Sequence, residues 1–199
     1  MAQDIILASG SASRAQMLRQ AGVPFRVVKA AVDEEALRDS LIAEGVGPRD
    51  LSDALAEMKA LRVSGREPGA MVIGSDQILS LDGEVLTKVD SRDAAREVLL
   101  RLRGKRHSLY SAAVICEEGK PTWRHVTEVK MLVRQFSDEF LDGYLDRAWP
   151  DVAGAVGCYH YEEEGVRLFS QVTGDYHAIL GMPLLPLLAF LTTRGLIEG

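Results

Sequence analysis

The first fourteen residues constrain this chain more than any other segment. Residues 5–8 are an apolar run that predicts a buried strand, and residues 15–21 predict a helix. The turn between them, Ser9-Gly10-Ser11-Ala12-Ser13-Arg14, adds three hydroxyls and a guanidinium. A small-residue turn at a helix N-terminus gathers free main-chain N–H groups and the positive end of the helix dipole, so it predicts a phosphate or polyphosphate site. Simple helix capping by a serine is the open alternative, because the pattern is neither a P-loop nor a dinucleotide fingerprint.

Length and charge narrow the class of protein. The 199 residues are enough for one domain, and we expect a single domain over residues 1–199. The formal net charge of -6 argues against a nucleic-acid binder, which normally carries a basic face. A small anionic ligand remains compatible, because arginines and lysines can cluster locally in an acidic protein.

Cysteine usage and hydropathy favour a cytoplasmic protein. Cys116 and Cys158 belong to no CxxC motif and are expected to be reduced, structural thiols. From the residues before the first strand we expect no signal peptide. The apolar stretch 179–191 is short and interrupted by Gly181 and Pro183, so no membrane span is expected.

Further strands and helices are expected to interleave. The strands are expected at 25–29, 71–76, 78–81, 84–86, 106–116, 122–136, 159–161 and 166–172. Asp82-Gly83 predicts a hairpin, and a second hairpin is expected around residues 162–165. Because hairpins accompany the strand–helix units, the fold class is α/β with a mixed sheet.

Helices are expected where apolar residues recur at helical spacing. The ranges are 36–44, a helix capped by Asp50 or Ser52, a helix from Ser91 to 102, a helix after Ser137, and 183–194.

No G-x-S-x-G elbow supports a serine nucleophile, and the four histidines show no metal spacing.

Two carboxylates are candidates for chemistry. Asp76 ends the apolar run 71–76, and ligands of α/β folds bind at the carboxyl ends of strands. It can bind a divalent metal or accept a proton from water, and turn capping is the alternative role. Glu34 can join it on Mg²⁺, although an acidic turn is more often a solvated surface.

Two lysines complete the candidate set. Lys59 is expected off the apolar face of its helix, which carries Leu51, Leu55, Met58 and Leu61, and Lys88 follows the first hairpin. Each is weak evidence alone, because lysines are usually solvated. They gain weight only if they converge on the turn that carries Arg14.

Together these residues resemble a known family. The segment Ile6-Leu7-Ala8-Ser9-x-Ser11-x-x-Arg14 is similar to the N-terminal signature of Maf-like nucleoside triphosphate pyrophosphatases. The similarity continues in order through Val32-Asp33-Glu34, Lys59-Ala60, Gly74-Ser75-Asp76-Gln77, Lys88, Leu102-Arg103-Gly104-x-x-His107, Ala153-Gly154, Gly174-Asp175-Tyr176 and Gly181-Met182-Pro183-Leu184. The resemblance covers nearly the whole chain, and many motifs in the right order are more specific than any one of them.

The resemblance implies hydrolysis of a nucleoside triphosphate to the monophosphate and pyrophosphate with Mg²⁺ or Mn²⁺. It implies that Asp76 accepts the proton of the attacking water and that Glu34 helps to bind the metal. The triphosphate would be held by Ser9, Ser11, Arg14, Lys59 and Lys88. The implied fold is the Maf/inosine-triphosphatase-like one, a long twisted mixed sheet flanked by helices in two lobes with a central cleft. The family often forms homodimers, which makes a homodimer an expectation here.

Three further positions would select the base by this resemblance. They are Ser13, Gln77 and Glu162. The pyrimidine branch has Arg, Thr and Gln there, and the 7-methyl-GTP branch has Trp, Gln and Glu. This chain matches the second branch at Gln77 and Glu162, whereas Ser13 matches neither. The chain also has Val89 where a proline is usual and Ala178 where an asparagine is usual.

Two other functions compete with pyrophosphate release. The first is a non-catalytic, nucleotide-binding regulator of cell division or septum formation, for which an intact Asp76 would be unnecessary. The second is a phosphatase that releases single phosphates. Product analysis separates the second from a pyrophosphatase, and loss of the Asp76 carboxylate tests the first.

Overall fold

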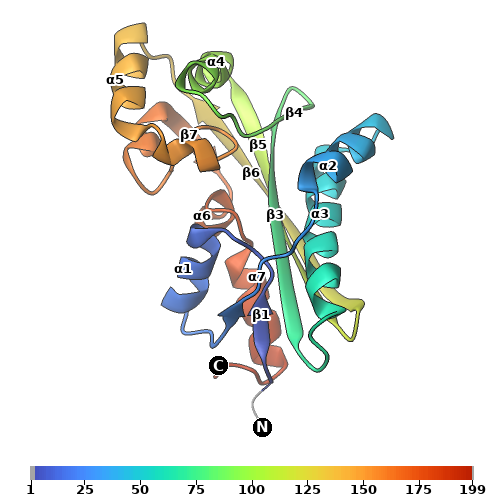
Figure 1. Cartoon of the computed structure of the whole chain (residues 1–199). Helices are drawn as coiled ribbons and strands as arrows, with labels where there is room; N and C mark the ends of the chain where they lie inside the picture. The colour runs from blue at the N-terminus through green and yellow to red at the C-terminus, as the bar shows by residue number, and fades with distance from the viewer. Residues whose placement is uncertain (1–2, 199) are drawn as a thin grey trace.

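The computed structural model describes residues 3–198 and contains one seven-stranded mixed sheet. The strands are β1 (Ile5–Leu7), β2 (Arg26–Val27), β3 (Met71–Leu81), β4 (Glu84–Leu86), β5 (Arg106–Glu117), β6 (Lys120–Val133) and β7 (Phe169–Thr173). The sheet order is β2-β1-β3-β5-β6-β7, with β4 also paired to β3 (Figure 1). The pairings of β1 with β2 and with β3 are parallel, and every other pairing is antiparallel.

Helices cover both faces of this sheet. They are α1 (Ala12–Gln20), α2 (Glu34–Ala43), α3 (Pro48–Ser64), α4 (Arg92–Leu102), α5 (Asp138–Ala148), α6 (Tyr176–Ile179) and α7 (Leu184–Thr193), with 3-10 turns at Asp151–Gly154 and Glu164–Leu168. Figure 1 shows α2 and α3 on one side of β3, and α1, α6 and α7 on the other side below α4 and α5. This arrangement agrees with the expected fold of two lobes on one twisted mixed sheet.

The long strand β3 has no neighbouring strand along a short part of one edge. The strand β5 pairs with β3 from Val72 to Ser80 on one side. On the opposite side, β1 pairs only with residues 71–73 and β4 only with residues 79–81. Residues 74–78 therefore have no strand beside them on that side, and the two halves of the molecule meet there.

Alternation along β3 assigns its side chains to two separate layers. Val72 packs with Ala56 and Ala60 of α3. Ile73 packs with Leu18 of α1 and with α7, and residues further along the same face pack under α4 and α5. Asp76 and Gln77 are neighbours in the chain and so belong to opposite faces.

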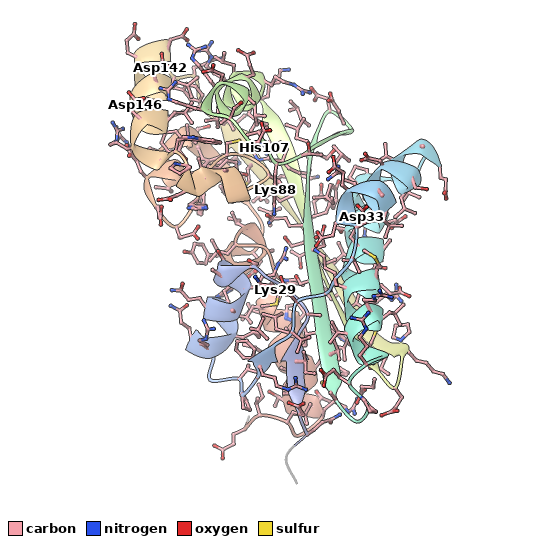
Figure 2. The ribbon with its side chains drawn as sticks, viewed as in Figure 1. Lys29, Asp33, Lys88, His107, Asp142 and Asp146 are labelled. Carbon is pink, nitrogen blue, oxygen red and sulfur yellow. The ribbon has the colours of Figure 1, made fainter. Side chains whose placement is uncertain are left out.

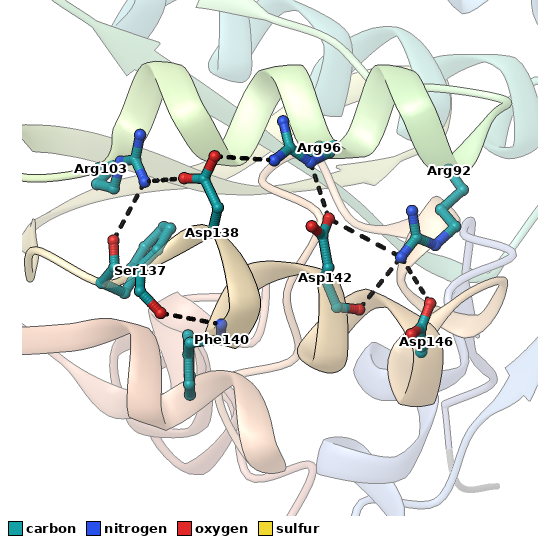
Figure 3. A network of polar contacts seen from close by, with 9 residues as sticks. Arg92, Arg96, Arg103, Ser137, Asp138, Phe140, Asp142 and Asp146 are labelled. Carbon is teal, nitrogen blue, oxygen red and sulfur yellow. Dashed lines mark hydrogen bonds and ion pairs between the residues drawn. The ribbon is translucent and has the colours of Figure 1, made fainter.

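A ladder of ion pairs joins α4 to α5 (Figure 3). The bonded pairs are Arg92–Asp146, Arg96–Asp142, Arg96–Asp138 and Arg103–Asp138. The acidic residues recur every four positions and therefore lie on one face of α5. Because these pairs are exposed to solvent, they define the register of the two helices more than they stabilise them.

Several local expectations are confirmed and others are wrong. The Asp82-Gly83 hairpin forms, with Asp82 at φ 53° and Gly83 at φ 89°, and Ser91 and Ser137 cap α4 and α5. The second hairpin is wrong, because β7 pairs with β6 and residues 159–161 form no strand. The strand expected at 25–29 is only two residues long and exposed.

The start of α3 also differs from the expectation. Neither Asp50 nor Ser52 caps this helix, because it begins earlier, with Gly47 as the N-cap and Pro48 at the first position. Proline favours the first helical position since it needs no N–H partner there.

Candidate active site

All ten sequence-predicted site residues line one cleft of about 800 Å³ beside the uncovered edge of β3. They are Ser9, Ser11, Ser13, Arg14, Glu34, Lys59, Asp76, Gln77, Lys88 and Glu162. The cleft thus brings together residues from the first turn, α2, α3, β3, the segment after β4 and the loop before β7. In Figure 2, Lys88 lies in the upper half of the view and Lys29 in the lower half, whereas Asp33 lies near α2 and α3.

The first turn is stabilised by its own serines and by Arg14. The Ser11 side chain caps α1 by accepting a hydrogen bond from the Arg14 main-chain N–H at 3.3 Å. The Ser9 hydroxyl accepts bonds from the Ser11 main-chain N–H and from Arg14 Nη1, both at 3.2 Å. The capping alternative is therefore correct for Ser11, and it is compatible with a phosphate site, because the same turn faces the cleft.

Arg14 is a buried cation at one wall of the cleft. Its relative exposure is 9%, and its Nε donates to the Gly181 carbonyl at 2.8 Å. Burial lowers the pKa of Arg14 from its ordinary value, and the charges of Asp76 and Glu34 act in the opposite direction. A phosphate group in the cleft would compensate this buried charge.

Lys59 is bound by two carboxylates at the base of the cleft. Its Nζ lies 2.7 Å from Asp76 Oδ1 and 2.8 Å from Glu34 Oε2. The Lys59 and Asp76 side chains are only 6% and 12% exposed, whereas that of Glu34 is 51% exposed. The three charges form one cluster that joins α2, α3 and β3.

Two expectations about this cluster are wrong in their structural detail. Asp76 lies in the middle of β3 and not at its end, because the strand continues to Leu81. The relevant strand end is that of β1, which leaves the β3 edge open beside Asp76. Lys59 lies on the buried face of α3, together with Leu55 and Ala56. Of the predicted apolar stripe, Leu51 and Leu55 are buried, whereas Met58 and Leu61 are only partly buried.

Gly74 brings α3 close enough for Lys59 to reach Asp76. A Cβ atom at Gly74 would lie 2.1 Å from the Ala56 carbonyl oxygen and 2.7 Å from the Ala60 nitrogen. Both contacts are with main-chain atoms of α3, which cannot rotate away. The absence of a side chain at this position therefore permits the short distance between helix and strand.

Gln77 faces the opposite layer from Asp76 and is anchored there. Its Nε2 lies 2.9 Å from Ser111 Oγ, 2.9 Å from the Ala178 carbonyl oxygen and 3.0 Å from the Ile179 carbonyl oxygen, and these three acceptors share its two hydrogens. Carbonyl oxygens only accept, so the amide orientation follows from its partners. Gln77 Oε1 is consequently the polar atom that this side chain can offer to a ligand.

Sequence reasoning missed several polar residues near the cleft. Arg38 lines it from α2, four residues after Glu34, a spacing that places both side chains on one helix face. The Lys29 side chain packs beside Gly10, where an added Cβ would lie 3.5 Å from Lys29 Cε. The helical spacing could have identified Arg38 once the helix was known to begin at Glu34, whereas no sequence pattern pointed to Lys29.

Aromatic side chains contribute to the upper wall of the cleft. Tyr159 and Tyr161 both line it, and each packs against Phe169. The Tyr159 hydroxyl is bonded to the buried His107 ring at 2.8 Å. Burial lowers the pKa of His107 to about 4, so this histidine is neutral at pH 7.

The part of the chain that the structure describes contains no cluster of three or more His, Cys, Asp or Glu side chains suited to a metal ion. Glu34 and Asp76 therefore provide two carboxylates at most. Two carboxylates supplemented by substrate phosphates and water are a usual arrangement for Mg²⁺, so the donor set fits such an ion.

In residues 3–198 no helix is long and apolar enough to cross a membrane.

The chain is similar to known proteins over nearly its whole length. A family model described as Maf-like protein matches residues 4–194. A nucleoside triphosphate pyrophosphatase of Ruegeria pomeroyi is 52% identical over 198 residues, with 100% of both chains covered. Proteins with the same name from Caulobacter vibrioides and Rhodospirillum rubrum are 50% and 46% identical, and the aligned regions cover at least 96% of each chain.

Proposed function

The chain belongs to the family of Maf-like proteins, and from that premise we propose that it hydrolyses nucleoside triphosphates to nucleoside monophosphates and pyrophosphate. Relatives that match its full length at about half identity carry the name nucleoside triphosphate pyrophosphatase. The observation that carries the proposal is the Asp76–Lys59–Glu34 cluster, which lies in the same cleft as the first turn with its buried Arg14.

Each residue of the cluster and the first turn has its own role in the proposed hydrolysis. Asp76 accepts a proton from water as the water oxygen forms a bond to the α-phosphorus. The bond from the α-phosphorus to the bridging oxygen breaks, and pyrophosphate leaves with the electron pair. Arg14 and Lys88 hold the phosphate chain and stabilise the charge that develops on the leaving group. Lys59 keeps the Asp76 carboxylate in place, and the hydroxyls of Ser9 and Ser11 bind phosphate oxygens.

Charge balance supports a divalent cation in this reaction. Four cationic side chains line the cleft, against five carboxylates. The cleft as a whole therefore cannot neutralise a triphosphate. We infer that Glu34 and Asp76 help to hold Mg²⁺ or Mn²⁺, which supplies positive charge on the phosphate oxygens when it is bound.

The base-binding end of the cleft supports a methylated guanine nucleotide as substrate. Glu162 lines the cleft with an exposed carboxylate that can pair with the positive charge of a 7-methylated base. Gln77 adds the acceptor Oε1, because its amide nitrogen is bonded to the protein. Two acceptors match the N–H donors of guanine, and the small side chain of Ser13 lines the same cleft. On these grounds 7-methyl-GTP is the proposed substrate.

Pyrophosphate release from a panel of nucleotides tests the function. The panel contains dTTP, UTP, CTP, GTP and 7-methyl-GTP, each with Mg²⁺ or Mn²⁺, and chromatography identifies the products. Asp76→Asn keeps the shape of the side chain and should abolish turnover while the protein remains folded. Glu162→Gln should reduce turnover of 7-methyl-GTP more than that of the other nucleotides, and an equal loss for all would refute its role in base choice. Release of single phosphates would point to a phosphatase, and no release at all to a binding regulator.

A further inference from the structure

Residues 174–181 are bonded to the cleft through their main chain. This segment contains the one-turn helix α6, which Asp175 caps by accepting from the Ala178 N–H at 2.9 Å. The carbonyl groups at the end of a helix lack partners within the helix. Here the carbonyls of Ala178, Ile179 and Gly181 accept hydrogen bonds from side chains of α1, β3 and β5.

One of these carbonyls, that of Gly181, binds Arg14, which lies in the part of the cleft expected to hold the phosphates. The Gly181 oxygen accepts from Arg14 Nε at 2.8 Å and from Ser75 Oγ at 3.1 Å. Gly181 has φ 107°, and a Cβ atom there would lie 3.4 Å from Arg14 Nε. The guanidinium therefore packs directly against this main chain, and the Ser75 hydroxyl holds the same oxygen from the sheet.

The other two carbonyls serve Gln77. The Ala178 oxygen accepts from Ser111 Oγ at 2.6 Å and from Gln77 Nε2 at 2.9 Å, and the Ile179 oxygen accepts from the same nitrogen. Since Ser111 donates its one hydroxyl hydrogen to Ala178, its oxygen is free to accept from Gln77. Ser111 thus bonds both to the amide and to the carbonyl that orients the amide.

We propose that Ser75 and Ser111 are positioning residues that act through segment 174–181. Ser75 and Ser111 are fully buried and neither lines the cleft, so neither touches a bound nucleotide. Ser75 positions Arg14 through Gly181 and sets affinity for the phosphate chain. Ser111 fixes Gln77 with Oε1 toward the cleft and sets discrimination between bases. The inference deepens the proposed function and rests on it for the identity of the ligand.

Calorimetric titrations separate the two effects. The variants are Ser75→Ala and Ser111→Ala, with Ser80→Ala as the matched control. Like them, Ser80 is buried and does not line the cleft, and it lies on β3 as Ser75 does. The ligands, each with Mg²⁺, are inorganic tripolyphosphate, which has no base, and the α,β-methylene analogues of GTP and UTP, which resist cleavage. Circular dichroism and thermal unfolding confirm that each variant is folded.

The expected pattern differs between the two serines. Ser75→Ala should weaken all three ligands by a similar factor of about two- to tenfold, the effect of one lost hydrogen bond. Ser111→Ala should leave tripolyphosphate affinity unchanged and shift the ratio of GTP to UTP analogue affinity by about two- to tenfold. Ser80→Ala should match the wild type.

The same titrations can overturn the inference. Equal weakening of every ligand by both variants, or behaviour like that of Ser80→Ala, would show that the serines have no separate positioning roles. Binding is measured without turnover, so the titrations distinguish these outcomes even where the protein hydrolyses none of the nucleotides. Absence of hydrolysis would refute the proposed function and would appear only in the pyrophosphate assay.

Discussion

Substitution of Gly74 by alanine should disable the enzyme by displacing a helix. The new Cβ would lie 2.1 Å from the Ala56 carbonyl oxygen, so α3 must move outward by about 1 Å to restore an ordinary contact. Overpacking of this kind costs about 1–3 kcal/mol of unfolding free energy. For a chain of about 150–250 residues, each kcal/mol lowers Tm by about 2–4 °C.

The effect of Gly74→Ala on activity should exceed its effect on stability. The moving helix carries Lys59, whose Nζ lies 2.7 Å from Asp76 Oδ1. A misplacement of about 1 Å can reduce the rate by about 10²-fold. The assays are thermal unfolding and kcat for pyrophosphate release.

A matched control for Gly74→Ala lies at the end of the same helix. At Gly65 an added Cβ makes only an ordinary contact, 3.5 Å from the Leu61 carbonyl oxygen. Gly65→Ala should therefore change unfolding free energy by less than about 0.5 kcal/mol and leave kcat unchanged. Wild-type stability and kcat in Gly74→Ala would refute the claim that this close approach positions Lys59.

Three further predictions concern charges. Lys59→Met should abolish turnover and destabilise the fold, because it leaves Asp76 and Glu34 facing each other without their shared cation. Chemical denaturation measures the loss of stability, and pyrophosphate release measures the loss of turnover. A wild-type kcat would refute the role of the cluster. Glu34→Gln should raise the Mg²⁺ concentration needed for half-maximal turnover by about tenfold or more, whereas Glu44→Gln, at the other end of α2 and outside the cleft lining, should leave it near the wild-type value. Burial lowers the pKa of His107 to about 4 in the folded state, whereas the unfolded chain has the ordinary pKa of about 6.5. Between these two pH values only the unfolded chain binds the proton, so the free energy of unfolding should fall as the pH is lowered from about 6.5 to about 4. Thermal unfolding across this range should show a shallower decline in His107→Phe, and an equal decline would exclude His107 as its source.

The sequence predicted which residues line the cleft better than it predicted the packing that brings them together. The first turn, the Asp82-Gly83 hairpin and the capped helices are local, since each depends on a few adjacent residues. The burial of Lys59 is not local. It depends on the rotation of α3 against β3, and Gly74 permits that approach from a distant part of the chain.

Tertiary pairing explains the expectations that were wrong. The segment 159–161 has the residues of a strand, but β7 pairs with β6 instead, and Tyr159 bonds to His107. Asp76 looked like the end of a strand because the apolar run 71–76 ends in this acidic residue, whereas β5 continues to pair with β3 as far as Ser80. No pattern within one segment reveals which partner strand will extend it.

The continuous strand β3 has a mechanical consequence. It runs beneath both groups of helices, and β5 and β6 accompany it, so no linker separates the walls of the cleft. A rotation of one half against the other would have to bend three hydrogen-bonded strands together. The base of the cleft is consequently preorganised, and ligand-dependent movement is expected in the parts that lie outside these three strands. The two halves should also lose their structure together in a single cooperative transition.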